Sequence, residues 1–221
     1  MKHTRTTAAL MSALVTLALT LSPPAHAAAI GSAYPGMTII QGKSKCTLAY
    51  IDTIQRIGYS AGHCNTSTIV TDEDRNLIGI VTDSQDNRAG NTHTRADDVV
   101  IDYETISINP NVNITDMLGP TLNHPIVTQQ GLTPRPGMHV CHLGATTACS
   151  CGDIDMIYDG WFTMKTDTMT SEHGDSGGPV YTYTDAAGDS PVIVGILRGL
   201  HGNNVAAVSW PDTLRYAAHP K

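Results

Sequence analysis

The sequence predicts an all-β fold made of two β units. Three observations lead to this prediction. The apolar segments are short and lie between turn-forming residues, helical periodicity is weak throughout, and a polar connection rich in Asn and Pro, roughly 109–125, divides the segments into two groups. Many short strands at this spacing are typical of β-barrels and β-sandwiches.

Eight segments have the character of strands between turn signals. Four precede the polar connection and four follow it, so each unit has enough strands for a sheet of its own. The segments are 47–54 (TLAYIDTI), 67–72 (STIVTD), 76–83 (NLIGIVTD), 98–108 (DVVIDYETISI), 138–144 (MHVCHLG), 152–158 (GDIDMIY), 179–184 (PVYTYT) and 191–199 (PVIVGILRG).

Residues 1–27 have the layout of a secretory signal peptide. Lys2 and Arg5 precede an apolar run of 14 residues, and small residues follow at a cleavage site. The run is too short to span a bilayer comfortably, and no later segment is long and apolar enough. We therefore expect an exported chain, cleaved after Ala27 or Ala29, that has no membrane partner after cleavage.

Charge and length limit the function further. Removal of 1–27 takes away two of the 13 basic residues and none of the 20 acidic residues, which leaves a formal net charge of −9. Such a surface is poorly suited to nucleic acid. About 194 residues remain, enough for one large core or two small ones. We place the two units at 28–115 and 116–221.

Five cysteines in an exported chain predict disulfides with one thiol left over. They are Cys46, Cys64, Cys141, Cys149 and Cys151. A zinc site is the competing interpretation, because Cys149 and Cys151 lie near His139 and His142. Their spacing is not a usual zinc pattern and an oxidising compartment favours a bridge, so no metal is expected.

The segment 172–180, EHGDSGGPV, contains a candidate nucleophile. Ser176 is either a small residue in a glycine-rich turn or a catalytic serine, which needs a base and a third group that orients the base. A candidate base is His63 in GYSAGHCN, 58–65. It precedes Cys64, and a bridge from Cys64 to Cys46 would clamp the segment that presents His63.

SAGHC and GDSGGP together resemble the chymotrypsin-like serine proteases. The span from CTLAYI to SAGHC and the stretch PGMHVCHLGATTACSCGDI are most similar to the short secreted actinomycete branch, and the match covers about 36–215. The resemblance implies two antiparallel six-stranded β-barrels with the active site in the cleft between them. It further implies a secreted, monomeric serine endopeptidase that acts on protein or peptide substrates without a cofactor.

The resemblance also assigns roles to single residues. Ser176 would be the nucleophile and His63 the base, and the N–H groups of Gly174 and Ser176 would form the oxyanion hole. Asp175 would hold this loop through an internal partner. A second disulfide, Cys141–Cys151, would leave Cys149 as the odd thiol, either buried and inert or exposed.

The third member of the triad is an acid from the segment RADDVVIDYETISI. In a strand, Asp97 shares a face with Val99 and Ile101, whereas Asp98 shares one with Asp102 and Glu104. Because a triad acid is buried behind its histidine, we expect Asp97, with Asp98 as the alternative.

Six residues are expected around the specificity pocket: Thr170, Ser171, His173, Arg198, Gly199 and Leu200. Thr170 lies where trypsin-type members carry an acid, so a preference for Arg or Lys is not indicated. Arg198, Ser171, His173 and His201 together would favour an acidic or polar substrate residue, as in glutamate-cleaving members. The alternative is that these are loop residues that face solvent.

Two other functions remain open. A catalytically silent relative would bind a partner with the same fold, although silent relatives usually lose a triad member and all parts are present here. An esterase is the other alternative, because 174–178 matches G-x-S-x-G. The order His, Asp, Ser and the His63–Cys64 pair argue against the esterase.

Overall fold

The computed structural model describes residues 31–88, 94–120, 124–165, 167–184 and 191–219. The expected signal peptide and its two expected cleavage positions lie outside these ranges. Within them, the chain forms strands β1 to β15, a short 3₁₀-helix, η1 (Gly62–Cys64), and one α-helix, α1 (Trp210–Ala217). The predicted all-β class is confirmed, with α1 as an addition.

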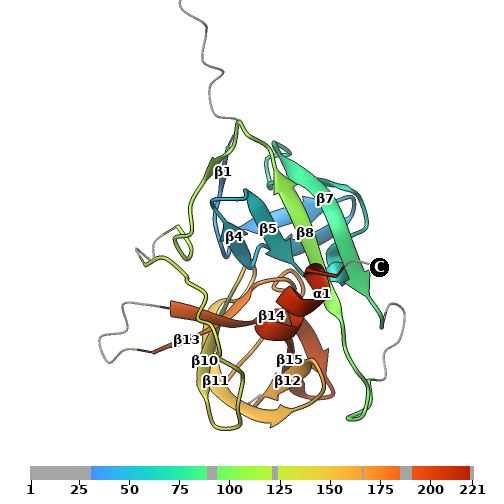
Figure 1. The fold of residues 1–221 in the computed structure, drawn as a ribbon, viewed down its shortest axis with the longest axis vertical. Helices are drawn as coiled ribbons and strands as arrows, with labels where there is room; N and C mark the ends of the chain where they lie inside the picture. The colour runs from blue at the N-terminus through green and yellow to red at the C-terminus, as the bar shows by residue number, and fades with distance from the viewer. Residues whose placement is uncertain (1–30, 89–93, 121–123, 166, 185–190, 220–221) are drawn as a thin grey trace, which may run out of the picture.

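The first unit is a curled sheet of seven strands in the order β3-β2-β6-β7-β8-β5-β4. These strands are β2 (Thr38–Gln41), β3 (Ser44–Thr47), β4 (Tyr50–Asp52), β5 (Ile57–Ser60), β6 (Ile69–Thr71), β7 (Leu77–Asp86) and β8 (Asp102–Ile108). Leu48 and Ala49, both fully buried, separate the edge strands β3 and β4 along the chain. The sheet is therefore curled, and its two edge strands follow one another along the chain (Figure 1). It differs from the expected six-stranded closed barrel because the bend at Leu48 divides one segment into two strands, β3 and β4.

The second unit is a closed six-stranded barrel, as expected, in the order β10-β11-β12-β15-β14-β13. Its strands are β10 (His139–Gly144), β11 (Ala148–Ile157), β12 (Trp161–Met164), β13 (Pro179–Tyr183), β14 (Pro191–His201) and β15 (Asn204–Ser209). All paired neighbours are antiparallel. Phe162, Met164, Val194 and Leu197 are fully buried in one of its apolar clusters, so side chains fill the barrel.

The end of the chain returns from the second unit to the first. Trp210, the first residue of α1, packs edge-on against the rings of Tyr50 and Tyr59, with ring centroids 5.2 and 5.1 Å apart. Figure 1 shows α1 where the sheet and the barrel meet. Two further short strands, β1 (Ser32–Ala33) and β9 (Asn113–Ile114), pair in parallel.

Each of the eight predicted segments contains or overlaps an observed strand. Strands such as β12 and β15 were not predicted, and neither was α1, which spans only eight residues and so gives little more than two turns of periodicity. The boundary between 115 and 116 stays a prediction.

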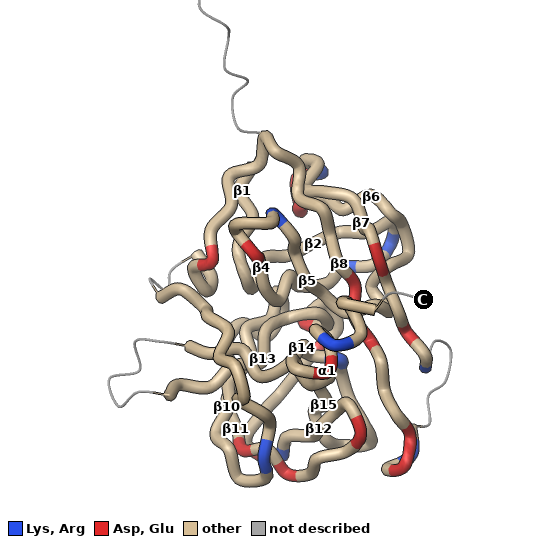
Figure 2. Tube along the Cα trace, viewed as in Figure 1, with Lys and Arg blue, Asp and Glu red and all other residues tan. Residues whose placement is uncertain are grey.

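The charges of the molecule are spread over both units. Figure 2 shows Lys and Arg interspersed with Asp and Glu along the trace. Within the described residues, no helix is both long and apolar enough to cross a membrane.

Candidate active site

The turn that carries His63 is fixed from two sides. Cys64, at its end, is buried and forms a disulfide with Cys46 on β3, as expected. A Cβ at Gly62 would collide with the carbonyl oxygens of Gln85 and Tyr103, so only glycine allows the turn to approach β7 and β8 this closely. His63 therefore lies against the start of β8.

Asp102, the first residue of β8, is the acid that contacts His63. Its Oδ2 lies 2.8 Å from Nδ1 of His63, and its Oδ1 accepts the main-chain N–H of His63 at 2.9 Å. The Asp102 side chain is fully buried, whereas the His63 side chain is 34% exposed. Burial lowers the pKa of His63, but the hydrogen bond and charge of Asp102 raise it more, so the net pKa is above its ordinary value.

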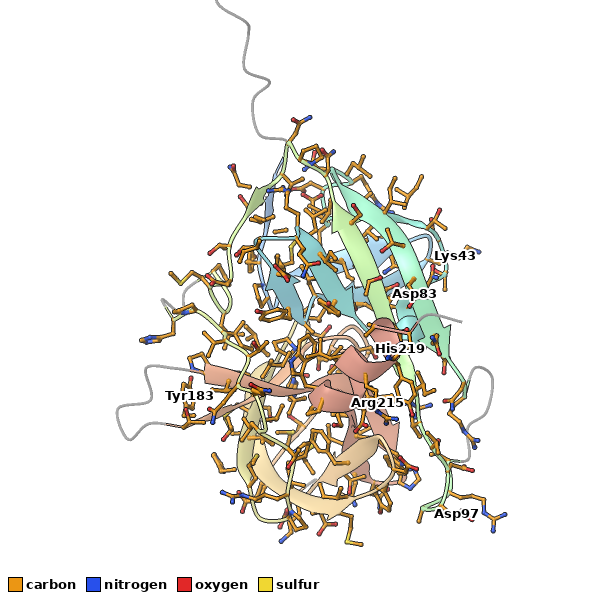
Figure 3. The ribbon with its side chains drawn as sticks, viewed as in Figure 1. Lys43, Asp83, Asp97, Tyr183, Arg215 and His219 are labelled. Carbon is orange, nitrogen blue, oxygen red and sulfur yellow. A yellow bond between two sulfur atoms is a disulfide. The ribbon has the colours of Figure 1, made fainter. Side chains whose placement is uncertain are left out.

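Asp97 was the wrong choice of acid. Its side chain is 81% exposed and its carboxylate lies 3.6 Å from the guanidinium of Arg95. Figure 3 shows Asp97 at the edge of the molecule. The alternative, Asp98, is also elsewhere, since its Oδ2 pairs with Arg88 at 2.7 Å.

The error has a physical cause. The predicted alternation needs a strand from residue 97, but β8 begins only at Asp102. Furthermore, residues 102–106 are all buried, so this part of β8 has no solvent face. Asp102 and Glu104 were assigned to the solvent face because they are acidic. The sequence did contain a signal for Asp102, since this acid lies between the apolar residues Ile101 and Tyr103.

The loop before Ser176 is held by the carboxylate of Asp175. Its Oδ1 accepts the N–H groups of Thr146 and Thr147 at 2.8 and 2.9 Å, and its Oδ2 accepts the N–H of Glu172 at 2.8 Å and the hydroxyl of Thr147. Burial raises the pKa of Asp175, but these donors lower it more. Asp175 thus has internal partners, of which Thr146 and Thr147 lie in the turn between β10 and β11 and Glu172 lies in its own loop.

Gly174 has a backbone conformation that strongly favours glycine. Its φ is +104°, and a Cβ would collide with the hydroxyl of Thr146. Its carbonyl accepts the hydroxyl of Thr47 at 2.8 Å, which turns the peptide. Among the hydrogen bonds of the described residues, none has the N–H of Gly174 or Ser176 as donor, so both donors are free for a ligand.

The hydroxyl of Ser176 points to the carbonyl oxygen of Arg198, 3.3 Å away. No hydrogen bond joins Ser176 to His63 within the part of the chain that is described. The two residues nevertheless line the same two cavities. Hydrogen bonds between catalytic groups are often long or poorly aligned before substrate binds.

The first cavity, of about 600 Å³, matches most of the expected specificity pocket. Its lining consists of His63, Ser171, Glu172, His173, Ser176, Arg198, Gly199 and Leu200. Thr170 is absent from this lining. Its carbonyl accepts a hydrogen bond from Nε2 of His142 at 2.6 Å, and its N–H donates to the hydroxyl of Ser150 at 3.0 Å. Glu172 lines the cavity although the sequence analysis did not select it.

Two of the four residues considered for an acidic substrate are engaged elsewhere. Nε of Arg198 is buried and lies 3.4 Å from Oδ2 of Asp102. His201 packs edge-on against Trp161, with ring centroids 4.9 Å apart. Arg198 nevertheless lines the cavity together with Ser171 and His173, whereas His201 does not, so three of the four residues lie at the expected pocket.

A second cavity, of about 480 Å³, is also lined by Ser176. It is lined by Lys43, Ser44, Lys45, Cys46, His63, His173, Gly174 and Ser176. Both cavities are therefore lined from both units, and they share His63, His173 and Ser176.

The remaining cysteines follow the expected pairing. Cys141 on β10 and Cys151 on β11 form a disulfide, and Cys149 is an exposed free thiol whose Sγ lies 3.5 Å from the hydroxyl of Tyr181. His139 lies close to Cys141 and Cys151, and His63 close to Cys46 and Cys64. The sulfurs of both sets are in disulfides, so they are not thiolates available to a metal.

No family model matches the chain. The uncharacterized protein Rv1815 of Mycobacterium tuberculosis is 36% identical over 197 residues, which cover 89% of this chain and 87% of that protein. Among solved structures, a glutamic acid specific serine protease described as using a histidine triad in substrate binding has a TM-score of 0.61 at 18% identity, covering 85% of this chain and 97% of its own.

Two further structures are similar. Thermobifida fusca Protease A has a TM-score of 0.58 at 21% identity and covers 84% of this chain and 97% of its own. Cellulomonas bogoriensis chymotrypsin has a TM-score of 0.56 at 19% identity and covers 83% of this chain and 95% of its own. At these identities the likeness concerns the fold.

Proposed function

The chain belongs to the same family as the uncharacterized protein Rv1815 of Mycobacterium tuberculosis and has the chymotrypsin-like serine protease fold, and from this premise we propose that it is a secreted serine endopeptidase. One observation carries the proposal: a buried Asp102 bonds to Nδ1 of His63 beside Ser176, where the two cavities meet. Burial of a carboxylate is costly unless it is paired, so this arrangement serves a purpose other than simple packing.

The proposed reaction is acyl transfer through an acyl-enzyme. Nε2 of His63 takes the proton from Oγ of Ser176 as Oγ attacks the substrate carbonyl carbon. Asp102 holds the proton on Nδ1 and stabilises the imidazolium. The imidazolium then protonates the leaving amine, and water hydrolyses the acyl-enzyme with His63 again as the base.

The free N–H groups of Gly174 and Ser176 are assigned to the oxyanion of the tetrahedral intermediate. Asp175 holds both donors in place through the turn at Thr146 and Thr147. One such donor is typically worth about 10² to 10³ in rate. The site thus has a nucleophile, a base, an orienting acid and an electrophilic stabiliser.

The two cavities favour an endopeptidase. A substrate whose scissile carbonyl lies at Ser176 would have chain on both sides, one part in the cavity at Leu200 and the other in the cavity at Lys45. The first cavity is lined by the anion Glu172 and the cation Arg198, so the formal charges of its lining balance and do not by themselves select a basic or an acidic side chain.

A silent binding protein is the second candidate, because Oγ of Ser176 bonds to the carbonyl of Arg198. One experiment separates the two. The chain from residue 28 onward is incubated with a fluorophosphonate, in parallel with Ser176→Ala, and analysed by peptide mass spectrometry. We expect one adduct, on Ser176, and none in the variant; a folded wild-type protein that stays unlabelled would favour the silent binder.

Cleavage of a peptide library then tests the substrate class. We expect internal peptide bonds to be cut by the wild-type protein and not by Ser176→Ala. The proposed secretion is tested separately, by N-terminal sequencing of protein recovered from the culture medium. It should begin at residue 28 or 30, and an intact residue 1 in the medium would contradict cleavage.

A further inference from the structure

Arg198 touches both sides of the proposed catalytic group. Arg198 lies in β14 between Leu197 and Gly199, where the register of the pairing with β15 shifts. The main-chain carbonyl of Arg198 accepts the hydroxyl of Ser176 at 3.3 Å, and Nε of its side chain lies 3.4 Å from Oδ2 of Asp102. One residue thus contacts the nucleophile through its backbone and the acid through its side chain.

The contact with Asp102 is a buried one. Asp102 is fully buried and Arg198 is 18% exposed. Charges in such a place are screened less than surface charges, so a guanidinium at this distance attracts the carboxylate more strongly than it would at the surface. Nε of Arg198 forms no hydrogen bond, so the contact is ionic, and Oδ2 is shared between Arg198 and Nδ1 of His63.

We propose that Arg198 is a positioning residue of the site: its guanidinium pairs with the buried Asp102 carboxylate, holds it in place, and shares it with His63. The proposal rests on the proposed function and deepens it. The expected specificity role of Arg198 is thereby replaced by a role in the electrostatics of the base.

The consequence concerns the protonation of His63. A fixed cation beside Asp102 opposes the imidazolium, so it lowers the pKa of His63 from the value that Asp102 alone would produce. The base is then neutral, and able to accept the proton of Ser176, at a lower pH. The same cation would destabilise the imidazolium that forms in the transition state. The net effect of Arg198 on the rate therefore depends on pH.

Other charged groups also face His63 and are unchanged by substitution of Arg198. Asp86 on β7 raises the pKa of His63, and Glu104 on β8 interacts with its charge. Glu172 and His173 line the first cavity beside His63, and Lys43 and Lys45 line the second. A comparison of variants at residue 198 therefore isolates the contribution of Arg198.

The test measures the pKa of His63 by NMR titration of its ring, in Ser176→Ala so that cleavage cannot interfere. Arg198→Gln removes the charge and is expected to raise the pKa of His63 by about one unit. Arg198→Lys keeps the charge and is expected to stay close to the parent. Arg135→Gln, an exposed residue in another cavity, makes the same charge change and should leave the pKa unmoved.

An unchanged pKa in folded Arg198→Gln, or the same pKa change in Arg198→Lys as in Arg198→Gln, would overturn the proposal. If Arg198→Gln does not fold, Arg198→Met, which keeps the packed alkyl chain, is titrated in its place and judged by the same criterion. In the active protein, the acidic limb of the kcat/KM profile should move upward by the same amount. Because the titration needs no turnover, an unlabelled Ser176 would refute the proposed function without deciding the role of Arg198.

Discussion

Asp102 meets His63 twice, with Oδ2 2.8 Å from Nδ1 and Oδ1 2.9 Å from the main-chain N–H. An ionised carboxylate can accept hydrogen bonds but cannot donate them, so Nδ1 of His63 carries the proton in the neutral ring. The lone pair of Nε2 is then left for the proton of Ser176. The main-chain bond fixes the position of the turn as well as the tautomer.

Replacement of Asp102 by Asn should reduce kcat by about 10⁴, because an amide at this position favours the wrong tautomer of His63. Asp97→Asn is the matched control and should leave kcat unchanged, since the Asp97 side chain is exposed and pairs with Arg95 instead of His63. Steady-state kinetics on a peptide substrate measure both. A large loss in Asp97→Asn and none in Asp102→Asn would reverse the assignment.

Gly174→Ala should lower kcat by 10² or more, because the side chain strains a φ of +104° and collides with Thr146, which displaces one oxyanion donor. Gly137→Ala is the control. Gly137 also has a positive φ, of +77°, but a Cβ there has no heavy atom within 4 Å. It should lose some stability and keep its kcat; equal losses of kcat in the two variants would argue against the oxyanion assignment.

The pKa of Glu104 is raised to about 8, chiefly by burial. The hydrogen bond from Gln41 lowers this pKa, and the charge of Asp102 raises it further. The folded state therefore keeps a proton that the unfolded chain releases above about pH 4.5. Between that pH and about 8, the free energy of unfolding must fall as pH rises.

Glu104→Gln should remove this dependence, because Gln imitates the protonated acid. At pH 8 the variant should exceed the wild type by roughly 2–4 kcal/mol, and near pH 4.5 the two should be similar. Urea unfolding at both values measures the difference. Glu73→Gln, at an exposed residue paired with Lys45, should change stability by less than about 1 kcal/mol at either pH. An equal effect of Glu104→Gln at both values would show that Glu104 does not carry the pH dependence.

The double substitution of Cys46 and Cys64 by Ala should cost about 3 kcal/mol, because the bridge closes a loop over a sequence separation of 18. It should also slow fluorophosphonate labelling of Ser176, since the bridge holds the turn of His63. Cys149→Ala removes an exposed free thiol and should change stability by about 0.5 kcal/mol or less. A double variant as stable as Cys149→Ala would mean that other contacts suffice to hold the turn.

Much of the molecule follows from local patterns in the sequence. Each predicted strand segment meets an observed strand, because alternation and turn residues act over a few neighbours. Ser176, His63 and both disulfides were identified from the resemblance carried by short segments, and the structure places His63 and Ser176 at the same cavities.

The acid and the role of Arg198 depended on contacts across the fold. Asp102 is buried because β8 lies between β5 and β7 and is also covered by the turn of η1, and no pattern within its own segment records those three neighbours. Likewise, the side chain of Arg198 enters the site because Asp102, 96 residues earlier in the chain, presents a buried carboxylate to it.

The sequence by itself therefore determined the β class, the positions of about half of the strands, and the candidate nucleophile and base, all of which reside in short segments. The tertiary structure alone decided which acid contacts His63 and which charge faces that acid. The physical reason is that burial and charge pairing depend on what the rest of the chain brings to a residue. From the pattern of its own strand, an acidic side chain is predicted to face solvent, and only the folded structure shows whether other elements cover it.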